Sequence, residues 1–131
     1  MVDDKMKQIK SYKLKPQDEK VVHLFTELGM PKNLARTLMY ISNVDECRSA
    51  EIEQGTKLRQ PEVSVVIQQL QEKGWIKKRD LKNKGKGRPV YIYKLTSSIE
   101  DIIKKFEKEK IKEIENIKSN LAELKSLLED R

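Results

Sequence analysis

The amino-acid sequence predicts a mainly α fold with a small β-hairpin (α+β), and three observations lead to this class. Apolar residues recur at helical spacing over most of the chain. Two short β-prone runs, residues 75–81 and 90–95, flank a segment rich in Lys and Gly that is closed by Pro89. The last third of the sequence is typical of one long amphipathic helix. At 131 residues, the chain has the length of one domain with an appended element.

The first 15 residues form a basic extension, which fits either a disordered arm or a short helix that docks on a partner subunit. The first clear helix begins at Pro16, a residue suited to a first helical turn, and Gly29 ends it. Its apolar residues recur at helical spacing: Val21, Val22, Phe25 and Leu28. We interpret His23 as a surface or packing residue, because nothing near it in the sequence could complete a metal site.

A second amphipathic helix is predicted after Pro31, and Ser42 and Asn43 end it. Its apolar positions are Leu34, Ala35, Leu38, Met39 and Ile41. Cys47 and Arg48 are expected to form a very short strand, and Ser49 is expected to cap a third helix over residues 50–55. Because Cys47 is the single cysteine, an internal disulfide is excluded. The simplest interpretation of Cys47 is a small buried residue, with a redox-sensing thiol as the alternative.

A fourth helix is predicted from Pro61 to about Lys73, with Gly74 as its stop. Its apolar positions define a buried face: Val63, Val66, Ile67 and Leu70. The opposite face is polar but almost uncharged, and it begins beside Arg59 and Gln60. This face carries Glu62, Ser64, Val65, Gln68, Gln69 and Gln71. Gln, Ser and Arg can hydrogen-bond base edges in a major groove, although the same pattern also fits a solvated helix surface.

The predicted hairpin accounts for the whole net charge of the chain. Its basic residues are Lys77, Lys78, Arg79, Lys82, Lys84, Lys86, Arg88 and Lys94. Against Asp80 alone they give a net charge of +7, which equals that of the whole chain. Because the rest of the chain has no net charge, a strongly cationic hairpin indicates a polyanionic partner. Nucleic acid fits best, because acidic residues on the polar face of the last helix would be repelled by an anionic membrane.

The last segment, residues 98–131, is predicted to be a coiled-coil-like dimerisation helix. Ser98 and Asp101 make a plausible capping box at its start. Its apolar residues form a seam that no small domain could bury: Ile103, Phe106, Ile114, Ile117, Leu121, Leu124 and Leu128. The seam is continuous only with a four-residue stutter at Lys110. Self-association is the economical explanation, and a helix folded back on its own domain is the alternative.

The order of elements is a helix-turn-helix followed by a wing, over residues 16–97. Four stretches carry a family resemblance: residues 49–52 (SAEI), 60–64 (QPEVS), 70–76 (LQEKGWI) and 87–96 (GRPVYIYKLT). They resemble winged-helix transcription regulators of the MarR, ArsR and TrmB type, and most of all the archaeal single-domain members. The resemblance implies that Ser64 and its exposed helix neighbours face DNA, and that Arg88 reaches the backbone or minor groove. It also implies a homodimer on imperfect palindromes, often a repressor.

Two departures from the family pattern limit what can be carried over. Trp75 stands where Leu is usual, which should change only the packing at the base of the hairpin. The sequence also lacks both the sugar-binding domain of full-length TrmB-type proteins and the multi-cysteine motif of many ArsR-type sensors. Whether the protein binds a small-molecule effector is therefore left open, and the sequence identifies no residues for such a site.

The sequence therefore predicts a homodimeric, sequence-specific regulator of transcription that binds double-stranded DNA and acts as a repressor. The residues expected to contact bases are Arg59, Gln60, Glu62, Ser64, Val65 and Gln68, and those expected to hold the backbone are Lys84, Lys86 and Arg88. The alternatives are a non-specific architectural DNA-binding protein and a winged-helix protein–protein adaptor. We expect no enzyme activity, cofactor or metal site, since no catalytic or ligand constellation is visible. Without a signal peptide or a long apolar run, a soluble cytoplasmic protein is expected.

Overall fold

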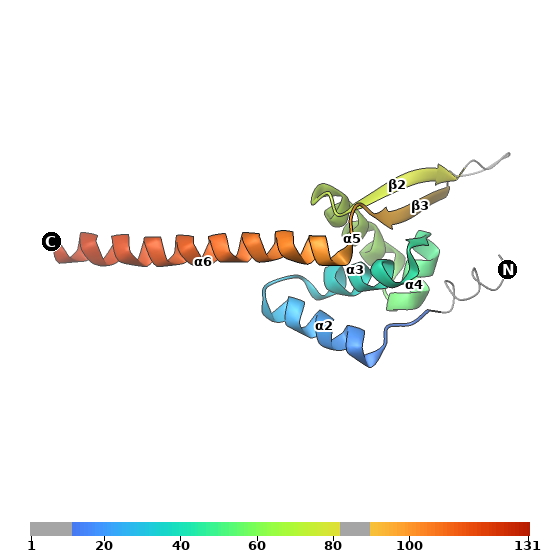
Figure 1. Cartoon of the computed structure of the whole chain (residues 1–131), viewed down its shortest axis with the longest axis horizontal. Helices are drawn as coiled ribbons and strands as arrows, with labels where there is room; N and C mark the ends of the chain where they lie inside the picture. The colour runs from blue at the N-terminus through green and yellow to red at the C-terminus, as the bar shows by residue number, and fades with distance from the viewer. Residues whose placement is uncertain (1–11, 82–89) are drawn as a thin grey trace. The chain divides into compact units, whose positions relative to one another are not determined.

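The computed structural model describes residues 12–81 and 90–131, and it confirms the mainly α class with a small sheet (Figure 1). The chain divides into two compact units, Met1–Ser98 and Ile99–Arg131. The first unit holds α2 (Pro16–Glu27), α3 (Lys32–Val44), β1 (Glu46–Cys47), α4 (Ser49–Thr56), α5 (Gln60–Glu72), β2 (Ile76–Leu81) and β3 (Val90–Leu95). The second unit is a single helix, α6 (Ile99–Glu129).

Helix α3 is the centre of the first unit. It contacts α2, α4, α5 and the sheet, and α2 lies on the side of α3 away from β2 and β3 (Figure 1). The helix begins after Pro31, and most of its circumference is buried. The buried apolar residues around it include Leu34, Leu38, Tyr40, Ile41, Ile52, Val63, Leu70 and Trp75. Each such side chain contributes about 1.5–3 kcal/mol of burial free energy, so the core fixes α4 and α5 against α3.

The sheet is antiparallel and has the order β1-β3-β2. The predicted hairpin is confirmed, with Ile76 opposite Leu95 and Leu81 opposite Val90. The short strand was expected at Cys47 and Arg48 but lies one residue earlier, at Glu46–Cys47. Its two residues pair with β3, which places β3 in the centre of the sheet.

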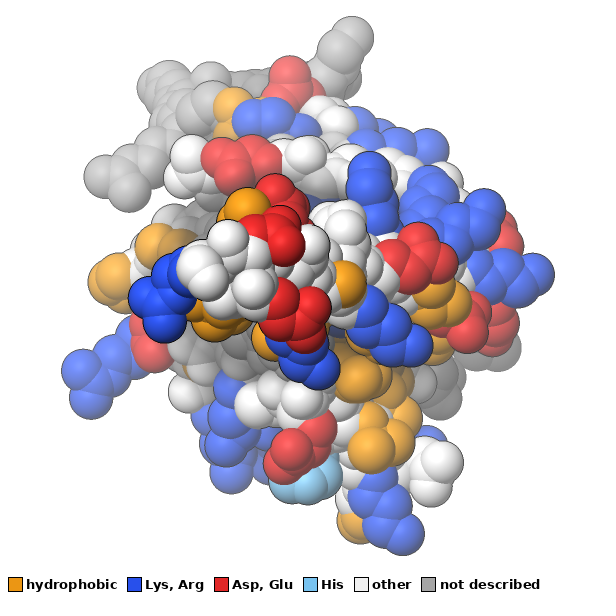
Figure 2. Space-filling model, turned by 90° about the vertical axis from the view of Figure 1, so that its left-hand side faces the viewer, with side chains coloured by type: hydrophobic (Ala, Val, Ile, Leu, Met, Phe, Trp, Pro, Cys, Tyr) orange, Lys and Arg blue, Asp and Glu red, His pale blue; other side chains and the backbone are white. Residues whose placement is uncertain are grey.

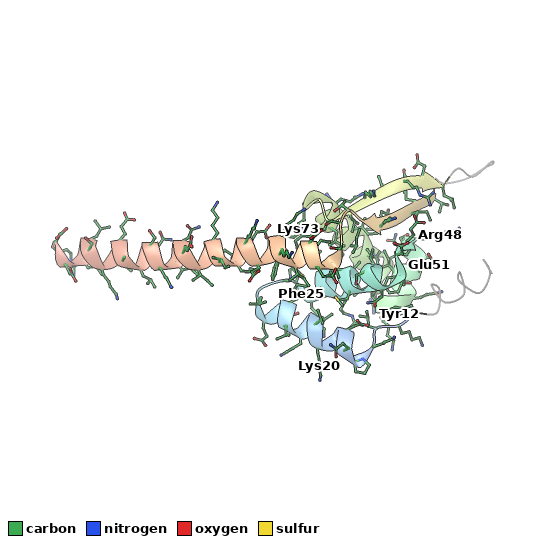
Figure 3. The ribbon with its side chains drawn as sticks, in the orientation of Figure 1. Tyr12, Lys20, Phe25, Arg48, Glu51 and Lys73 are labelled. Carbon is green, nitrogen blue, oxygen red and sulfur yellow. The ribbon has the colours of Figure 1, made fainter. Side chains whose placement is uncertain are left out.

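The segment before α2 is tied to the fold through a buried carboxylate. Asp18 accepts hydrogen bonds from the Tyr12 hydroxyl at 2.6 Å and from the Lys15 backbone N–H at 2.8 Å. Asn43 on α3 donates its amide N–H to the same carboxylate at 3.3 Å. Burial, together with the bond to Asp18, raises the pKa of the Tyr12 phenol. Tyr12, labelled in Figure 3, therefore stays a neutral donor that stabilises the start of α2.

Two local sequence predictions are wrong. Ser49 is the first residue of α4 rather than its cap, because the Glu51 carboxylate accepts the Arg48 backbone N–H at 2.7 Å and satisfies this helix end (Figure 3). Leu28 was assigned to the apolar face of α2, but the helix ends at Glu27 and Leu28 is 53% exposed.

Lys, Arg, Asp and Glu side chains spread over the face seen in Figure 2, with hydrophobic side chains between them. Charged residues make up 37% of the sequence, so this surface follows from the composition. Among the described residues, we find no helix with the length and apolar character needed to cross a membrane.

The backbone of α4 lies directly against a side chain of α3 at Gly55. A Cβ atom at this position would overlap Cδ1 and Cε1 of the Tyr40 ring and stand 2.8 Å from its Cζ. Tyr40 is fully buried, so its ring has little room to move. Gly55 therefore sets the distance between the two helices.

We predict that Gly55→Ala lowers the free energy of unfolding by about 1–3 kcal/mol, although Ala is the better helix former, because the added methyl group overpacks the Tyr40 contact. Urea unfolding followed by circular dichroism measures the change. Gln54→Ala, at the exposed neighbouring position, is the control and should stay within about 0.5 kcal/mol of the parent protein. A Gly55→Ala variant as stable as the parent would show that the contact is not a steric limit.

Candidate nucleic-acid interface

Helices α4 and α5 are joined by a turn of three residues, Lys57 to Arg59. Lys57 closes α4 in the left-handed region, with φ of 64°, and its N–H bonds to the Glu53 carbonyl at 2.9 Å. The Thr56 hydroxyl donates to the Ile52 carbonyl at 2.6 Å and accepts the Leu58 N–H at 3.3 Å. A buried threonine thus stabilises a turn that otherwise favours glycine. This geometry is a helix-turn-helix.

The first turn of α5 is held by one carboxylate. Glu62 accepts the Arg59 backbone N–H at 2.9 Å, and its second oxygen accepts from the Asn33 side chain of α3 at 3.4 Å. A negative charge is favourable at a helix N-terminus because the backbone N–H groups there carry partial positive charge. Glu62 therefore fixes both the start of α5 and its position beside α3.

The two faces of α5 are as the sequence predicts. Val63, Val66, Ile67 and Leu70 are buried. All six predicted base-contacting residues are exposed: Arg59, Gln60, Glu62, Ser64, Val65 and Gln68. The Ser64 hydroxyl donates to the Gln60 side chain at 3.1 Å, and the Gln68 amide donates to Glu72 at 3.4 Å. These residues form one exposed row of hydrogen-bonding groups, with Val65 as an apolar member.

The base of the hairpin is attached to the end of α5. Gly74 has φ of 76° and lets the chain reverse after the helix. The Thr96 N–H bonds to the Trp75 carbonyl at 2.9 Å, and the Thr96 hydroxyl donates to the Gly74 carbonyl at 2.7 Å. Trp75 itself is buried, which agrees with its predicted packing role. The hairpin direction is thus coupled to α5.

The three predicted backbone-contacting residues, Lys84, Lys86 and Arg88, lie outside the described residues. The described strands carry further cations in the same hairpin. Lys78 places its Nζ 4.4 Å from the centre of the Tyr91 ring, and Arg79 pairs with Glu46 at 3.1 Å. Lys77 and Lys94 complete this set.

Helix α6 exposes an apolar stripe. Of the seven predicted seam residues, six are exposed: Ile103, Ile114, Ile117, Leu121, Leu124 and Leu128. The seventh, Phe106, is buried, and the Lys110 Nζ lies 5.2 Å from the centre of its ring. Ile111 and Leu127 are also exposed and were not in the predicted seam. Ile111 could have been predicted as part of the stripe, because it lies three residues before Ile114 and therefore on the same side of the helix.

An open groove of about 840 Å³ lies where α2, α3 and the end of α4 meet. Leu14 and Leu24 contribute apolar surface, and Lys13, Lys20 and Lys57 contribute positive charge. Arg36, also in its lining, bonds to Glu19 at 2.5 Å and to the Thr56 carbonyl at 3.3 Å. Arg36 therefore links this groove to the turn that precedes α5.

Within the ranges 12–81 and 90–131, no group of His, Cys, Asp and Glu side chains could hold a metal ion. His23 is exposed and lies 3.5 Å from Glu27 in the same helix. Cys47 is buried, and burial, more than the carboxylates of Glu51 and Glu46, raises the pKa of its thiol to about 12. The thiol is therefore protonated at neutral pH and unsuited to redox sensing.

Comparisons with known proteins agree with this geometry. Residues 28–87 match the sequence model of the MarR family. A search of curated protein sequences found no match. Among solved structures, the chain resembles TrmBL2, described as an archaeal chromatin protein with a novel mode of DNA binding, at 19% identity and a TM-score of 0.54. The similarity covers 84% of this chain and 41% of TrmBL2, so the chain spans about two-fifths of that protein.

Two further structural neighbours have lower scores. MepR of Staphylococcus aureus, in a structure of its DNA complex, has 21% identity and a TM-score of 0.44, covering 98% of this chain and 95% of MepR. NadR in complex with 4-hydroxyphenylacetate has 17% identity and a TM-score of 0.49, covering 86% of this chain and 75% of NadR.

The helix-turn-helix, the buried and exposed faces of α5 and the attached hairpin define a winged-helix fold. Residues 28–87 within this fold match the MarR family, which agrees with the resemblance that the sequence motifs indicate.

We predict that Glu62→Ala lowers the free energy of unfolding by about 1 kcal/mol, because the Arg59 N–H and the Asn33 amide both lose their acceptor. Thermal unfolding measures the loss. Glu72→Ala, at the other end of the same helix, serves as the control. It removes the same charge, but the Glu72 carboxylate accepts a side-chain amide rather than a backbone N–H. Equal melting temperatures for the two variants would contradict a capping role for Glu62.

Proposed function

We propose that the protein is a homodimeric, sequence-specific repressor that binds double-stranded DNA in the cytoplasm. One observation carries the proposal: the exposed face of α5 is almost uncharged in a chain with 37% charged residues. A helix that only needed solubility would carry Lys and Glu there, as α6 does. A row of amides and hydroxyls instead favours contacts with base edges, which carry the sequence information of DNA.

In this proposal, α5 lies in the major groove with its N-terminal half toward the bases. The amide groups of Gln60 and Gln68 suit adenine, which presents one acceptor and one donor in that groove. Arg59 suits guanine, and the exposed Val65 suits the methyl group of thymine. Glu62 contributes chiefly by orienting α5, because both of its oxygens already accept hydrogen bonds.

The wing contributes affinity for DNA rather than sequence specificity. We assign Lys84, Lys86 and Arg88 to the flanking backbone and minor groove, where phosphates attract cations regardless of sequence. The attachment of the hairpin to α5 through Gly74, Trp75 and Thr96 supports this assignment, because it fixes where the strands leave the helix.

The apolar stripe of α6 supports a homodimer. The helix has 31 residues, and at 1.5 Å per residue it is about 46 Å long. The isoleucines and leucines of the predicted seam remain about half exposed in the single chain, at spacings that suit packing against a second copy. Two copies would present two α5 helices, which is the arrangement that reads a palindromic site. If a small-molecule effector acts on this dimer, the groove beside Arg36 has a suitable volume.

The fold shared with TrmBL2 keeps a non-specific architectural role as the second candidate, because TrmBL2 is itself an archaeal chromatin protein. Selection of bound duplexes from random and genomic DNA separates the candidates. A recurrent, imperfect palindrome supports the repressor, and a diffuse set of sequences supports the architectural role. A protein that binds no duplex at low salt would instead be an adaptor.

We predict that Gln68→Ala weakens binding to the selected site by about 1–3 kcal/mol but changes binding to random DNA little, because it removes hydrogen bonds to one base. The matched variant Lys84→Ala/Lys86→Ala should weaken binding to both DNAs and reduce the slope of log K against log salt by about two. Gel-shift titrations at several salt concentrations measure both. Equal losses on the two DNAs for Gln68→Ala would reject its base-reading role.

We predict that Leu121→Glu/Leu124→Glu converts the dimer to a monomer, because each leucine loses about 1.5–3 kcal/mol of burial and a charge enters the seam. Sedimentation equilibrium measures the mass. Ser119→Glu/Ser126→Glu, about half a turn away on the same helix, adds the same charge outside the seam and should leave a dimer. If both variants remain dimeric, α6 is not the interface.

A further inference from the structure

The exposed apolar stripe of α6 is uneven along the helix. From Ile114 onward an isoleucine or leucine recurs at alternating steps of three and four residues, and each of these side chains is more than half exposed. Before Ile114 this spacing is interrupted by Lys110, whose Nζ lies 5.2 Å from the centre of the Phe106 ring and 3.1 Å from the Glu113 carboxylate. The continuous part of the stripe therefore lies in the second half of α6. We call it the C-terminal seam, and it consists of Ile114, Ile117, Leu121, Leu124 and Leu128.

Two copies of the C-terminal seam could pack in either of two orientations, which differ in what each layer contains. In a parallel, in-register pair, every seam residue meets its own copy, so all layers of the seam are apolar. In an antiparallel pair, the two kinds of seam position in the seven-residue repeat meet each other instead. Such alignments bring a charged residue of the second copy opposite a seam residue: Lys110, Arg131 or Glu107, depending on the alignment. The parallel pair therefore buries the more apolar set.

The charges beside the C-terminal seam favour the same orientation. In a parallel pair, the residue just before the first seam position of a repeat faces the residue just after the second seam position on the other copy. This brings Glu113 opposite Lys118, and the two-fold symmetry makes the pair occur twice. In an antiparallel pair, residues of the Lys118 type face one another, so lysine faces lysine in each of the alignments above. Opposite charges thus meet in one orientation and like charges in the other.

Both members of the Glu113 and Lys118 pair are accessible in the single chain. The Glu113 side chain is 58% exposed, and its bond to Lys110 within the same helix is an exposed ion pair of the kind that contributes little. Lys118 is exposed and forms no ion pair within the part of the chain that the structure describes. A second copy can therefore supply the missing partner to each.

We propose that α6 pairs with its own copy as a parallel, in-register, two-stranded coiled coil over residues 114–128. The proposal rests on the homodimer proposed above and adds the orientation of the two chains. Each winged-helix unit is joined to the first residue of its own α6, so a parallel pair holds both units at the same end of the coiled coil. An antiparallel pair aligned through Lys110 would instead separate the two helix starts by roughly 60 Å. Half-sites on successive turns of a duplex are only about 34 Å apart, which favours the parallel pair.

The variant Leu128→Cys tests the orientation, because a cysteine at this seam position meets its own copy only in the parallel pair. Facing seam residues then lie within the range that a disulfide requires, roughly 4.4–6.8 Å between Cα atoms. Mild oxidation should convert most of the protein to a disulfide-linked dimer on a non-reducing gel. Ser126→Cys, near the same end of α6 but outside the seam, is the matched control and should give little of this product. The parent protein should give none, because its single cysteine, Cys47, is buried.

Sedimentation equilibrium of the reduced proteins separates the orientation from the homodimer itself. A cross-linked dimer for Leu128→Cys and not for Ser126→Cys supports the parallel pair. A reduced Leu128→Cys protein that is dimeric but does not cross-link overturns the proposed orientation and leaves the homodimer standing, and so does equal cross-linking of the two variants. A monomeric parent protein overturns the homodimer, and this proposal fails with it.

Exchange of the flanking charges gives a second, independent measurement. Glu113→Lys should raise the dissociation constant of the dimer about five-fold or more at low salt, because two attractions become two repulsions. Adding Lys118→Glu to the same chain reverses the pair and should restore most of the affinity. Residues 113 and 118 are too far apart along one helix to contact each other, so a restoration reports a contact between two copies. A double variant as weak as Glu113→Lys alone would overturn the pairing of Glu113 with Lys118.

Discussion

The contact between Gly55 and Tyr40 is the constraint on which the proposed DNA-binding surface depends. Because the glycine has no side chain, α4 lies directly against the Tyr40 ring of α3. The turn to α5 begins two residues later, so the position of α4 decides where the exposed face of α5 can be presented. A side chain at Gly55 would push α4 outward and move α5 with it. Interiors packed to this density transmit such displacements rather than absorb them.

Around this contact, the protein separates two kinds of surface. The exposed face of α5 is almost uncharged and hydrogen-bonding, whereas the hairpin concentrates the positive charge. Hydrogen bonds to bases depend on direction and carry specificity, and charge attraction to phosphates depends little on direction and carries affinity. Glu62 and Gly74 lie near the two ends of α5 and hold both surfaces at fixed positions relative to the helix. A change in α5 would therefore alter both contributions together.

Much of the fold could be predicted from the sequence because each element has a local signal. The helical spacing of Val63, Val66, Ile67 and Leu70 identified the buried face of α5, and Gly74 marked its end. The Gly- and Lys-rich segment between two β-prone runs identified the hairpin. Ser49 was misassigned because capping residues are judged by type, whereas here the Glu51 carboxylate satisfies the helix end. Leu28 was misassigned because periodicity does not say where a helix stops.

Other features of the site depend on register and packing that no local pattern contains. The opposition of Lys77 and Lys94 follows only from the alignment of the strands. The distance between Gly55 and Tyr40 depends on how two helices cross, and the bond from Asn33 to Glu62 joins residues on different helices. The exposure of the six α5 candidates could nevertheless be predicted, because it follows from the period of a helix with a clear apolar face.

The order of strands has a consequence for how the molecule behaves at high concentration. In the described sheet, β3 is central, and the two edges are β1, with two residues, and β2. Exposed strand edges are templates for pairing with other molecules, and natural proteins protect them by shortening the strand or charging it. Both protections are present, since β1 is very short and β2 carries Lys77, Lys78 and Arg79 in succession. The basic strand therefore also protects the sheet from aggregation.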